Sequence, residues 1–194
     1  DINEGINKVV MGPAKKSRLV TEPGKRITAY HEAGHAIIGS LLKYCDPIHE
    51  VTIIPRGQAA GYTMSRPDND NSHVSRQELL DDITMGLGGR VAEELIIKNY
   101  CTGASGDIKM ITDKARSMVT EWGLSDRIGP IYYGSNGEIF VGRDYQTEKG
   151  YSEEIAGVID EEVRAIIESC HQRATQILTE NINVLHNMAR VLVE

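Results

Sequence analysis

The sequence predicts a mainly α-helical fold with a small β-sheet, in which a helix precedes the strands and a helical bundle forms the C-terminal part. Several segments repeat apolar residues at the three- and four-residue spacing of an amphipathic helix. β-branched residues instead gather in short runs bounded by proline and glycine, which is typical of strands. A length of 194 residues, with 40% hydrophobic and 25% charged residues, fits one globular domain with its own core, or one domain with a small helical appendage.

The first two predicted helices are separated by a linker. Apolar residues at helical spacing predict a short amphipathic helix over residues 2–11, which Gly12 and Pro13 end. A basic and polar linker follows as far as Gly24. The next helix is predicted from Lys25 to about Cys45, because the proline at position 47 disfavours helical conformation in the residue before it.

Two short strands and a third helix are predicted next. Residues 49–55 are rich in β-branched side chains, and residues 62–64 are a candidate second strand beyond a turn. Ser75 and Glu78 have the spacing of a capping box, which opens a helix running to about Lys98. Glycines at positions 86, 88 and 89 each cost about 1 kcal/mol relative to alanine inside a helix. They therefore indicate either close backbone packing or a break in that helix.

The second half of the chain is predicted to be largely helical. A turn over 102–106 leads into a helix over 107–122, and short strands are predicted over 131–133 and 139–141. Ser152 caps a long helix that runs to about Leu178, and Asn181 caps the last helix. One face of the helix over 107–122 is apolar (Ile108, Ile111, Ala115, Met118 and Val119). The long helix has a similar face, for which core packing is favoured over contact with another subunit (Ile155, Ile159, Val163, Ile166 and Ile167).

Composition excludes several classes of function. A net charge of -7 and a pI near 5.4 argue against a nucleic-acid partner, because phosphate contacts require a basic face. No apolar stretch has the length of a membrane span, and no signal peptide is recognisable. The three cysteines, Cys45, Cys101 and Cys170, are odd in number and far apart. They favour buried, inert thiols in a reducing compartment over a disulfide framework.

The second helix contains an HExxH motif made of His31, Glu32 and His35. Residues four apart lie on one face of a helix, so the two imidazoles are placed to bind one Zn²⁺. Glu32 projects beside the metal, where it is able to take a proton from a water molecule. This predicts a zincin-like helix. The alternative is two surface histidines and a solvated glutamate.

A catalytic zinc ion needs a third protein ligand. The longer motif with a third histidine is excluded, because that histidine would fall at Leu41. Spacing leaves several candidates, each of which also has an ordinary structural role (His49, His73, Glu93, Glu94 and Asp107). In particular, the carboxylates of Glu93 and Asp107 cannot be separated on spacing alone.

Motifs along nearly the whole chain resemble the peptidase domain of FtsH-type ATP-dependent zinc metalloproteases, which are membrane-anchored AAA proteases. The matching segments occur in the family's order (residues 29–36, 51–57, 61–63, 88–94, 102–107 and 122–130). The resemblance implies that His31, His35 and Asp107 hold one zinc ion per chain and that Glu32 is the catalytic carboxylate. It also implies that Glu93 orients a zinc ligand. Gly106 departs from the pattern, because many relatives are expected to have asparagine there, which puts the local turn in question.

The same resemblance implies a larger context for residues 1–194, as one zinc metallopeptidase domain of a longer chain. The expected whole protein is a homo-hexamer that degrades unfolded polypeptides. An ATPase module would bind ATP upstream, since no phosphate-binding loop motif occurs here. An N-terminal segment would anchor the protein in the bacterial inner membrane, with the peptidase domain facing the cytoplasm, or in an organellar membrane. The fragment itself is expected to be soluble.

Other functions remain open at this point. Residues 58–64 offer a strand edge to an extended substrate, with Gly61, Tyr62 and Thr63 as candidate substrate-binding residues, or they form a purely structural strand. The alternative function is a non-catalytic helical oligomerisation module with a structural or vestigial metal site. Structural zinc sites usually have four protein ligands and many cysteines, which this sequence does not offer. A monomeric zinc peptidase acting alone is a third reading, which the missing secretion signal weakens.

Overall fold

The structure is a computed structural model of the 194-residue chain. It describes residues 5, 9, 12–13, 21–57, 59–67, 73–99, 101–134 and 150–194. The predicted helix over 2–11 and the predicted strand over 139–141 lie outside the described residues, apart from Gly5 and Val9.

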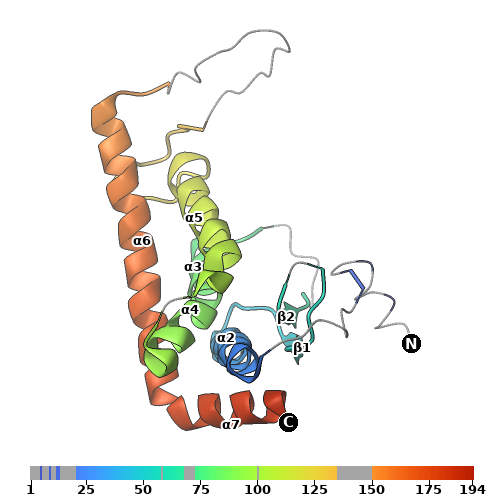
Figure 1. Cartoon of the computed structure of the whole chain (residues 1–194). Helices are drawn as coiled ribbons and strands as arrows, with labels where there is room; N and C mark the ends of the chain where they lie inside the picture. Colours follow the sequence, from blue (N-terminus) through green and yellow to red (C-terminus); the bar gives the residue numbers. More distant parts are fainter. Residues whose placement is uncertain are drawn as a thin grey trace.

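The described elements follow the predicted order along the chain, with helices before and after a two-stranded sheet. They are α2 (Glu22–Leu41), β1 (Ile48–Thr52), β2 (Tyr62–Ser65), α3 (Arg76–Gly86), α4 (Gly88–Ala92), a π-helix (Glu93–Ile97), a 3₁₀ turn (Thr102–Ala104), α5 (Ser105–Thr120), α6 (Glu153–Glu180) and α7 (Ile182–Val193). Figure 1 shows α2 in the middle, with the strands on one side and the long helix α6 on the other. The mainly α fold with a small sheet is confirmed. No helix in the described part of the chain combines the length and the apolar character that crossing a membrane requires.

Helix α2 is the central element, and it is buried along its second half. Thr21 caps its N-terminus by accepting a hydrogen bond from the Gly24 backbone, and proline occupies the first turn, where no donor is lost. The helix ends at Leu41, earlier than the predicted Cys45. The Tyr44 backbone N–H donates to the Asp81 carboxylate instead of continuing the helix. α4, α7 and the sheet surround α2, so its side chains meet neighbours in several directions.

Strands β1 and β2 form an antiparallel pair in which Val51 lies opposite Thr63. The predicted second strand is confirmed. β1 ends at Thr52 rather than at Pro55, because the Ile54 N–H bonds to the Thr52 hydroxyl and turns the chain. The pair packs against α2 and brings β2 beside the HExxH motif.

The single helix predicted over 75–98 is divided in the structure. Ser75 and Glu78 form the predicted capping box, but α3 ends at Gly86 and a new helix begins at Gly88. Gly88 lies so close to the backbone of Gly34 in α2 that a side chain at either position would collide with the other residue. Both predicted consequences of the glycines, a break and close packing, therefore occur.

The remaining helices build the core between α3, α5 and α6. The buried residues of α6 include Ile159, Val163 and Ile166, so the prediction that this face packs in the core is confirmed. On the apolar face of α5, Ile111, Ala115, Met118 and Val119 are buried, whereas Ile108 in the first turn is 43% exposed.

Two expectations for the C-terminal half were wrong. Residues 131–133 are not a strand, because the Tyr133 N–H donates to the Thr120 carbonyl at the end of α5. Asn181 does occupy the N-cap position of α7 but makes no side-chain cap there. Its amide instead donates to the Ile177 carbonyl at the end of α6.

Candidate metal centre

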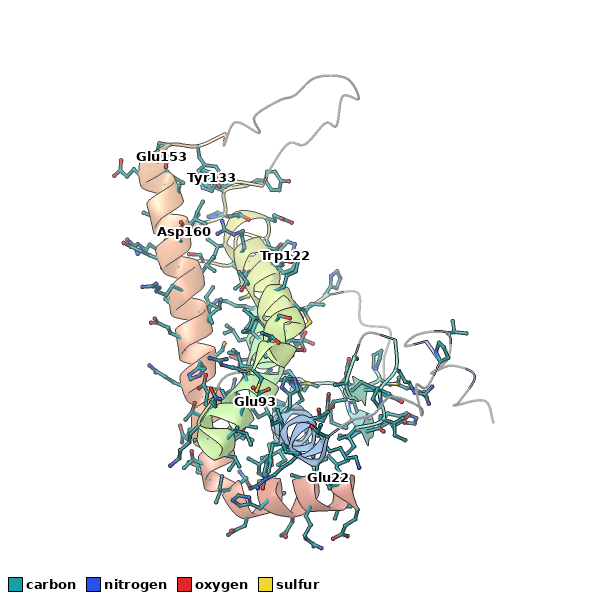
Figure 2. The ribbon with its side chains drawn as sticks, in the orientation of Figure 1. Glu22, Glu93, Trp122, Tyr133, Glu153 and Asp160 are labelled. Carbon is teal, nitrogen blue, oxygen red and sulfur yellow. The ribbon has the colours of Figure 1, made fainter. Side chains whose placement is uncertain are left out.

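The two histidines of the motif are held in one orientation by acceptors outside the motif. Nδ1 of His35 lies 2.8 Å from the carbonyl oxygen of Met85, at the end of α3. Nδ1 of His31 lies 2.8 Å from Oε1 of Glu93, which is the first residue of the π-helix. Figure 2 shows Glu93 beside α2. Both Nδ1 atoms therefore carry the hydrogen, and in the neutral rings both Nε2 atoms carry a lone pair.

Asp107 joins these imidazoles from the first turn of α5. Its Oδ2 lies 3.2 Å from Nε2 of His31 and 3.8 Å from Nε2 of His35, and the two Nε2 atoms are 3.1 Å apart. A tetrahedral ion with bonds of about 2.0 to 2.1 Å would separate its ligand atoms by about 3.3 to 3.4 Å. The three observed separations bracket that value, so the side chains present fit a zinc ion.

The chemistry of this cluster also fits a cation. With the outer acceptors fixing the tautomers, two imidazole lone pairs and one carboxylate oxygen point at the same place. Three acceptors without a proton between them repel one another, and a cation removes that repulsion. Among the described residues, these three form the group of histidine, cysteine, aspartate or glutamate side chains that is able to hold an ion.

The pKa values of the cluster show the same demand for positive charge. Burial works to lower the pKa of His31, but its bonds to Asp107 and Glu93 outweigh this and raise it to about 9. Burial likewise works to raise the pKa of Asp107, but hydrogen bonds with His31 and His35 hold it well below its usual range. The surroundings of His31 and Asp107 thus favour a positive charge in the cluster.

Glu32 lies beside the cluster and does not contribute one of its three converging atoms. It is buried, and burial raises the pKa of its carboxyl although nearby His35 and the Thr63 hydroxyl act in the opposite direction. A carboxylate with a raised pKa is a better proton acceptor near neutral pH. Its Oε2 accepts a hydrogen bond of 2.8 Å from the Thr63 hydroxyl.

Glycines allow neighbouring elements to approach the site. A Cβ on Gly89 would lie 2.5 Å from the His31 ring, so α4 packs directly against that imidazole. Gly106, where the sequence departs from the expected asparagine, lies inside the first turn of α5 with open space around its missing side chain. An asparagine would fit there as well, so this departure does not disturb the turn before Asp107.

The other predicted candidates are not part of the cluster. His49 and His73 are exposed. Glu94 bonds to Arg90 and to His171 of α6, each at 2.8 Å, which is the ion-pair role considered for it. The cysteines have no activated thiol: burial raises the pKa of Cys45 to about 12 and also raises the pKa of Cys101 and Cys170.

The candidate substrate-binding residues lie close to Glu32. Gly61 faces Oε1 of Glu32, and Thr63 bonds to Oε2. The Tyr62 hydroxyl is instead used within the sheet, where it donates to Glu50 at 2.7 Å. Sequence reasoning missed the roles of the Met85 carbonyl and of the Thr63 hydroxyl. A backbone carbonyl leaves no signal in the sequence, and the Thr63 contact depends on how the sheet packs on α2.

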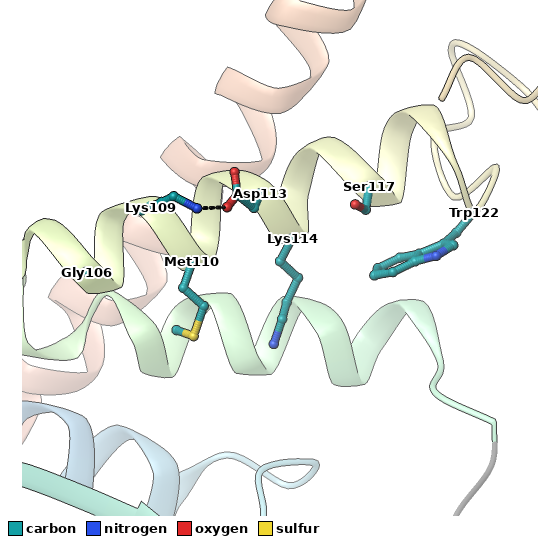
Figure 3. A pocket seen from close by; sticks show the side chains of 7 residues that line it. All are labelled: Gly106, Lys109, Met110, Asp113, Lys114, Ser117 and Trp122. Carbon is teal, nitrogen blue, oxygen red and sulfur yellow. Dashed lines mark hydrogen bonds and ion pairs between the residues drawn. The ribbon is translucent and has the colours of Figure 1, made fainter. Parts of the chain in front are cut away.

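A separate groove runs along α5, from Gly106 to Trp122 (Figure 3). Its charged side chains are already paired, Lys109 with Asp113 and Lys114 with Asp82, each at 2.8 Å. None of His31, Glu32, His35 and Asp107 is among its lining residues, so the groove is separate from the metal centre.

Two imidazoles one helical turn apart, a carboxylate from a second helix and a buried glutamate beside them form the arrangement used by HExxH metallopeptidases. The chain belongs to peptidase family M41, whose sequence model matches residues 18–194. The resemblance to FtsH-type proteases is confirmed at the level of the family.

Several relatives in this family are similar over the entire chain. It is 48% identical to the ATP-dependent zinc metalloprotease FtsH 1 of Thermoanaerobacter sp. (strain X514) and 49% identical to FtsH 3 of Symbiobacterium thermophilum. It is also 47% identical to the ATP-dependent zinc metalloprotease FtsH of Bacillus subtilis. Each comparison covers 100% of this chain but only 31–32% of the relative. The chain thus spans about a third of the length of these relatives.

Proposed function

We propose that this chain is a zinc-dependent endopeptidase domain that hydrolyses peptide bonds of unfolded polypeptides. The observation that carries the proposal is the convergence of His31 Nε2, His35 Nε2 and Asp107 Oδ2 beside the buried carboxylate of Glu32. The zinc metalloprotease names of the relatives support it. One zinc ion per chain is the stoichiometry that a single cluster of three ligands supports.

In this mechanism His31, His35 and Asp107 would hold the zinc ion, which would supply Lewis-acid chemistry to the scissile carbonyl and to water. Glu32 takes a proton from the attacking water and returns it to the departing amine, so no proton is lost over the cycle. Oε2 of Glu32 accepts from the Thr63 hydroxyl, so Oε1 is the oxygen proposed to carry this proton. No covalent acyl-enzyme is formed, so the serines and cysteines are not needed as nucleophiles.

Two residues outside the ligand set keep the imidazoles in place during this reaction. Glu93 and the Met85 carbonyl accept the Nδ1 hydrogens and so turn both Nε2 atoms toward the metal position. Oε2 of Glu93 also accepts from the Cys101 backbone at 3.2 Å. One carboxylate therefore connects the His31 ring to the segment that leads into Asp107.

The proposed substrate is an extended segment of polypeptide bound by main-chain hydrogen bonds. β2 lies directly against the Glu32 side chain, and Gly61, Tyr62 and Thr63 would supply the backbone edge for this pairing. Binding through the main chain tolerates many side-chain sequences, which suits a protease of unfolded proteins. A peptide analogue bound away from β2 would contradict this part of the proposal.

The relatives' names and lengths support a larger assembly. We place residues 1–194 as the peptidase domain of a longer chain, in which a further module uses ATP to deliver unfolded protein. The proposed whole protein is a membrane-anchored homo-hexamer. The membrane segment and the ATP site lie outside this sequence, and nucleic acid is not a proposed partner.

Replacing Glu32 by glutamine tests the proposed chemistry. Glutamine keeps the shape but takes no proton, so hydrolysis of an unfolded polypeptide such as casein should fall by about 10² to 10⁴-fold while bound zinc stays at one per chain. Glu22→Gln, the same change on the exposed start of the same helix, is the matched control and should keep full activity.

The outcomes separate the proposed function from its alternative. Full activity in Glu32→Gln would overturn the assignment of the base. A wild-type chain that holds zinc but never cleaves unfolded protein would instead support the non-catalytic oligomerisation module.

A further inference from the structure

Thr63 is bonded to the carboxylate that we assign as the general base, and we propose that Thr63 is its positioning residue. This inference rests on the proposed peptidase function. The Thr63 hydroxyl lies 2.8 Å from Oε2 of Glu32 and 3.1 Å from the backbone oxygen of the same residue. A hydroxyl bonded to a carboxylate makes a charge-assisted hydrogen bond, which is stronger than one between neutral groups.

Strand β2 approaches Glu32 closely, because the residue before the strand is Gly61. A Cβ on Gly61 would lie 3.0 Å from Oε1 of Glu32 and 2.6 Å from the Thr52 carbonyl. The strand therefore reaches the carboxylate only because position 61 has no side chain. Two residues farther along, the Thr63 hydroxyl contacts the opposite oxygen of the same carboxylate.

The two contacts leave Glu32 little freedom of orientation. A glutamate has three side-chain torsions, and the base must lie within hydrogen-bonding reach of the proton that it takes. The Thr63 bond occupies Oε2 and so fixes which oxygen is presented to the water. Because Thr63 is part of the sheet, its position is fixed by pairing with Val51.

The hydroxyl is also able to stay bonded through both charge states of the base. It has one hydrogen, which it donates to Oε2 while Glu32 is charged. When Glu32 has taken a proton on Oε1, the same hydrogen is able to turn to the Glu32 backbone oxygen, which lies 3.1 Å away. The proton that Glu32 carries stays on Glu32 throughout, so Thr63 acts on orientation and takes no part in proton transfer.

The positioning role belongs to the side chain of Thr63, whereas the proposed substrate-binding role belongs to its main chain. As a substrate-binding residue, Thr63 would contact the peptide and take no part in orienting the base, so loss of its hydroxyl would leave kcat unchanged. As a positioning residue, loss of the hydroxyl lowers kcat and leaves KM unchanged.

Three variants of the full zinc-loaded chain test the proposal with a quenched fluorescent peptide as substrate. Thr63→Val removes the hydroxyl with little change in shape and should lower kcat about tenfold, with KM and zinc content unchanged. Thr63→Ser keeps the hydroxyl and should restore kcat to within about threefold of wild type. Thr52→Val is the matched control, because it makes the same change on the partner strand, where the hydroxyl accepts from the Ile54 backbone.

The results separate the proposed positioning role of Thr63 from the proposed peptidase function. An active wild type with an equally active Thr63→Val, or a Thr63→Ser as slow as Thr63→Val, overturns the positioning role and leaves the peptidase function in place. A raised KM at unchanged kcat also overturns it, in favour of substrate contact. A zinc-loaded wild type without hydrolysis overturns both.

Discussion

Asp81 and Asp107 both have carboxylates placed between helices. The hydrogen-bond donors around Asp81 neutralise its negative charge, whereas the partners of Asp107 do not. Asp81 is almost fully buried and accepts from the Arg173 guanidinium, from the Gln77 amide at 2.9 Å and from the Tyr44 backbone at 3.2 Å. Every partner is a donor, and one of them is positively charged. The cluster is complete as it stands, as buried polar groups require.

Asp107 instead faces two imidazole nitrogens whose hydrogens are turned away from it. Its Oδ2 and the two Nε2 atoms need either a proton or a cation between them. The difference teaches how a carboxylate proposed as a metal ligand is distinguished from a structural one. Burial marks both, whereas a deficit of positive charge marks only Asp107.

The largest expected effect comes from breaking the incomplete cluster. Asp107→Asn removes the charge while keeping the shape, so zinc affinity should fall by more than the roughly 10- to 100-fold that loss of an outer partner costs. Peptide hydrolysis at limiting zinc should fall with it. Zinc titration of the folded variant measures this, and because Asp107 is partly exposed, circular dichroism should show an unchanged fold. A variant that binds zinc as wild type would return Glu93 to consideration as the third ligand.

The same substitution in the complete cluster should have the opposite result. Asp81→Asn places an amide among donors and leaves Arg173 without its counter-charge. We expect a loss of about 2 to 3 kcal/mol in the free energy of unfolding, below the usual value for a fully buried pair because Arg173 is 41% exposed. Urea unfolding measures it, and zinc bound per folded chain should stay at the wild-type level. Loss of zinc without loss of stability would contradict the comparison.

The HExxH helix and the start of α3 were predictable from the sequence, because each depends on residues only three or four positions apart. The HExxH spacing follows from helix geometry, and the capping box at Ser75 depends on residues three apart. The choice between Glu93 and Asp107 was not predictable from spacing. It depends on where α5 begins relative to α2, and on the π-helix, which begins at Glu93 and whose first residue bonds to the His31 ring.

Other differences from the prediction have the same origin in tertiary contacts. α2 is shorter than its apolar pattern, because Asp81 of another helix takes the Tyr44 N–H. Asn181 has the identity of an N-cap, but its side chain bonds to the preceding helix. In each case a polar side chain found a partner that the sequence pattern does not encode.

The smallest expected effect is on the pH dependence of stability in the metal-free chain. The folded pKa of His31, about 9, lies above its ordinary value of 6.5, so the bound proton stabilises the fold fully below pH 6.5. That contribution is lost as the pH rises through 9. With EDTA present, we expect the free energy of unfolding to fall by about 3 kcal/mol between pH 6 and pH 9.5 relative to a His31→Gln chain. Parallel pH profiles for the two chains would show that the cluster does not take up a proton in place of a cation, which would contradict the contrast with Asp81.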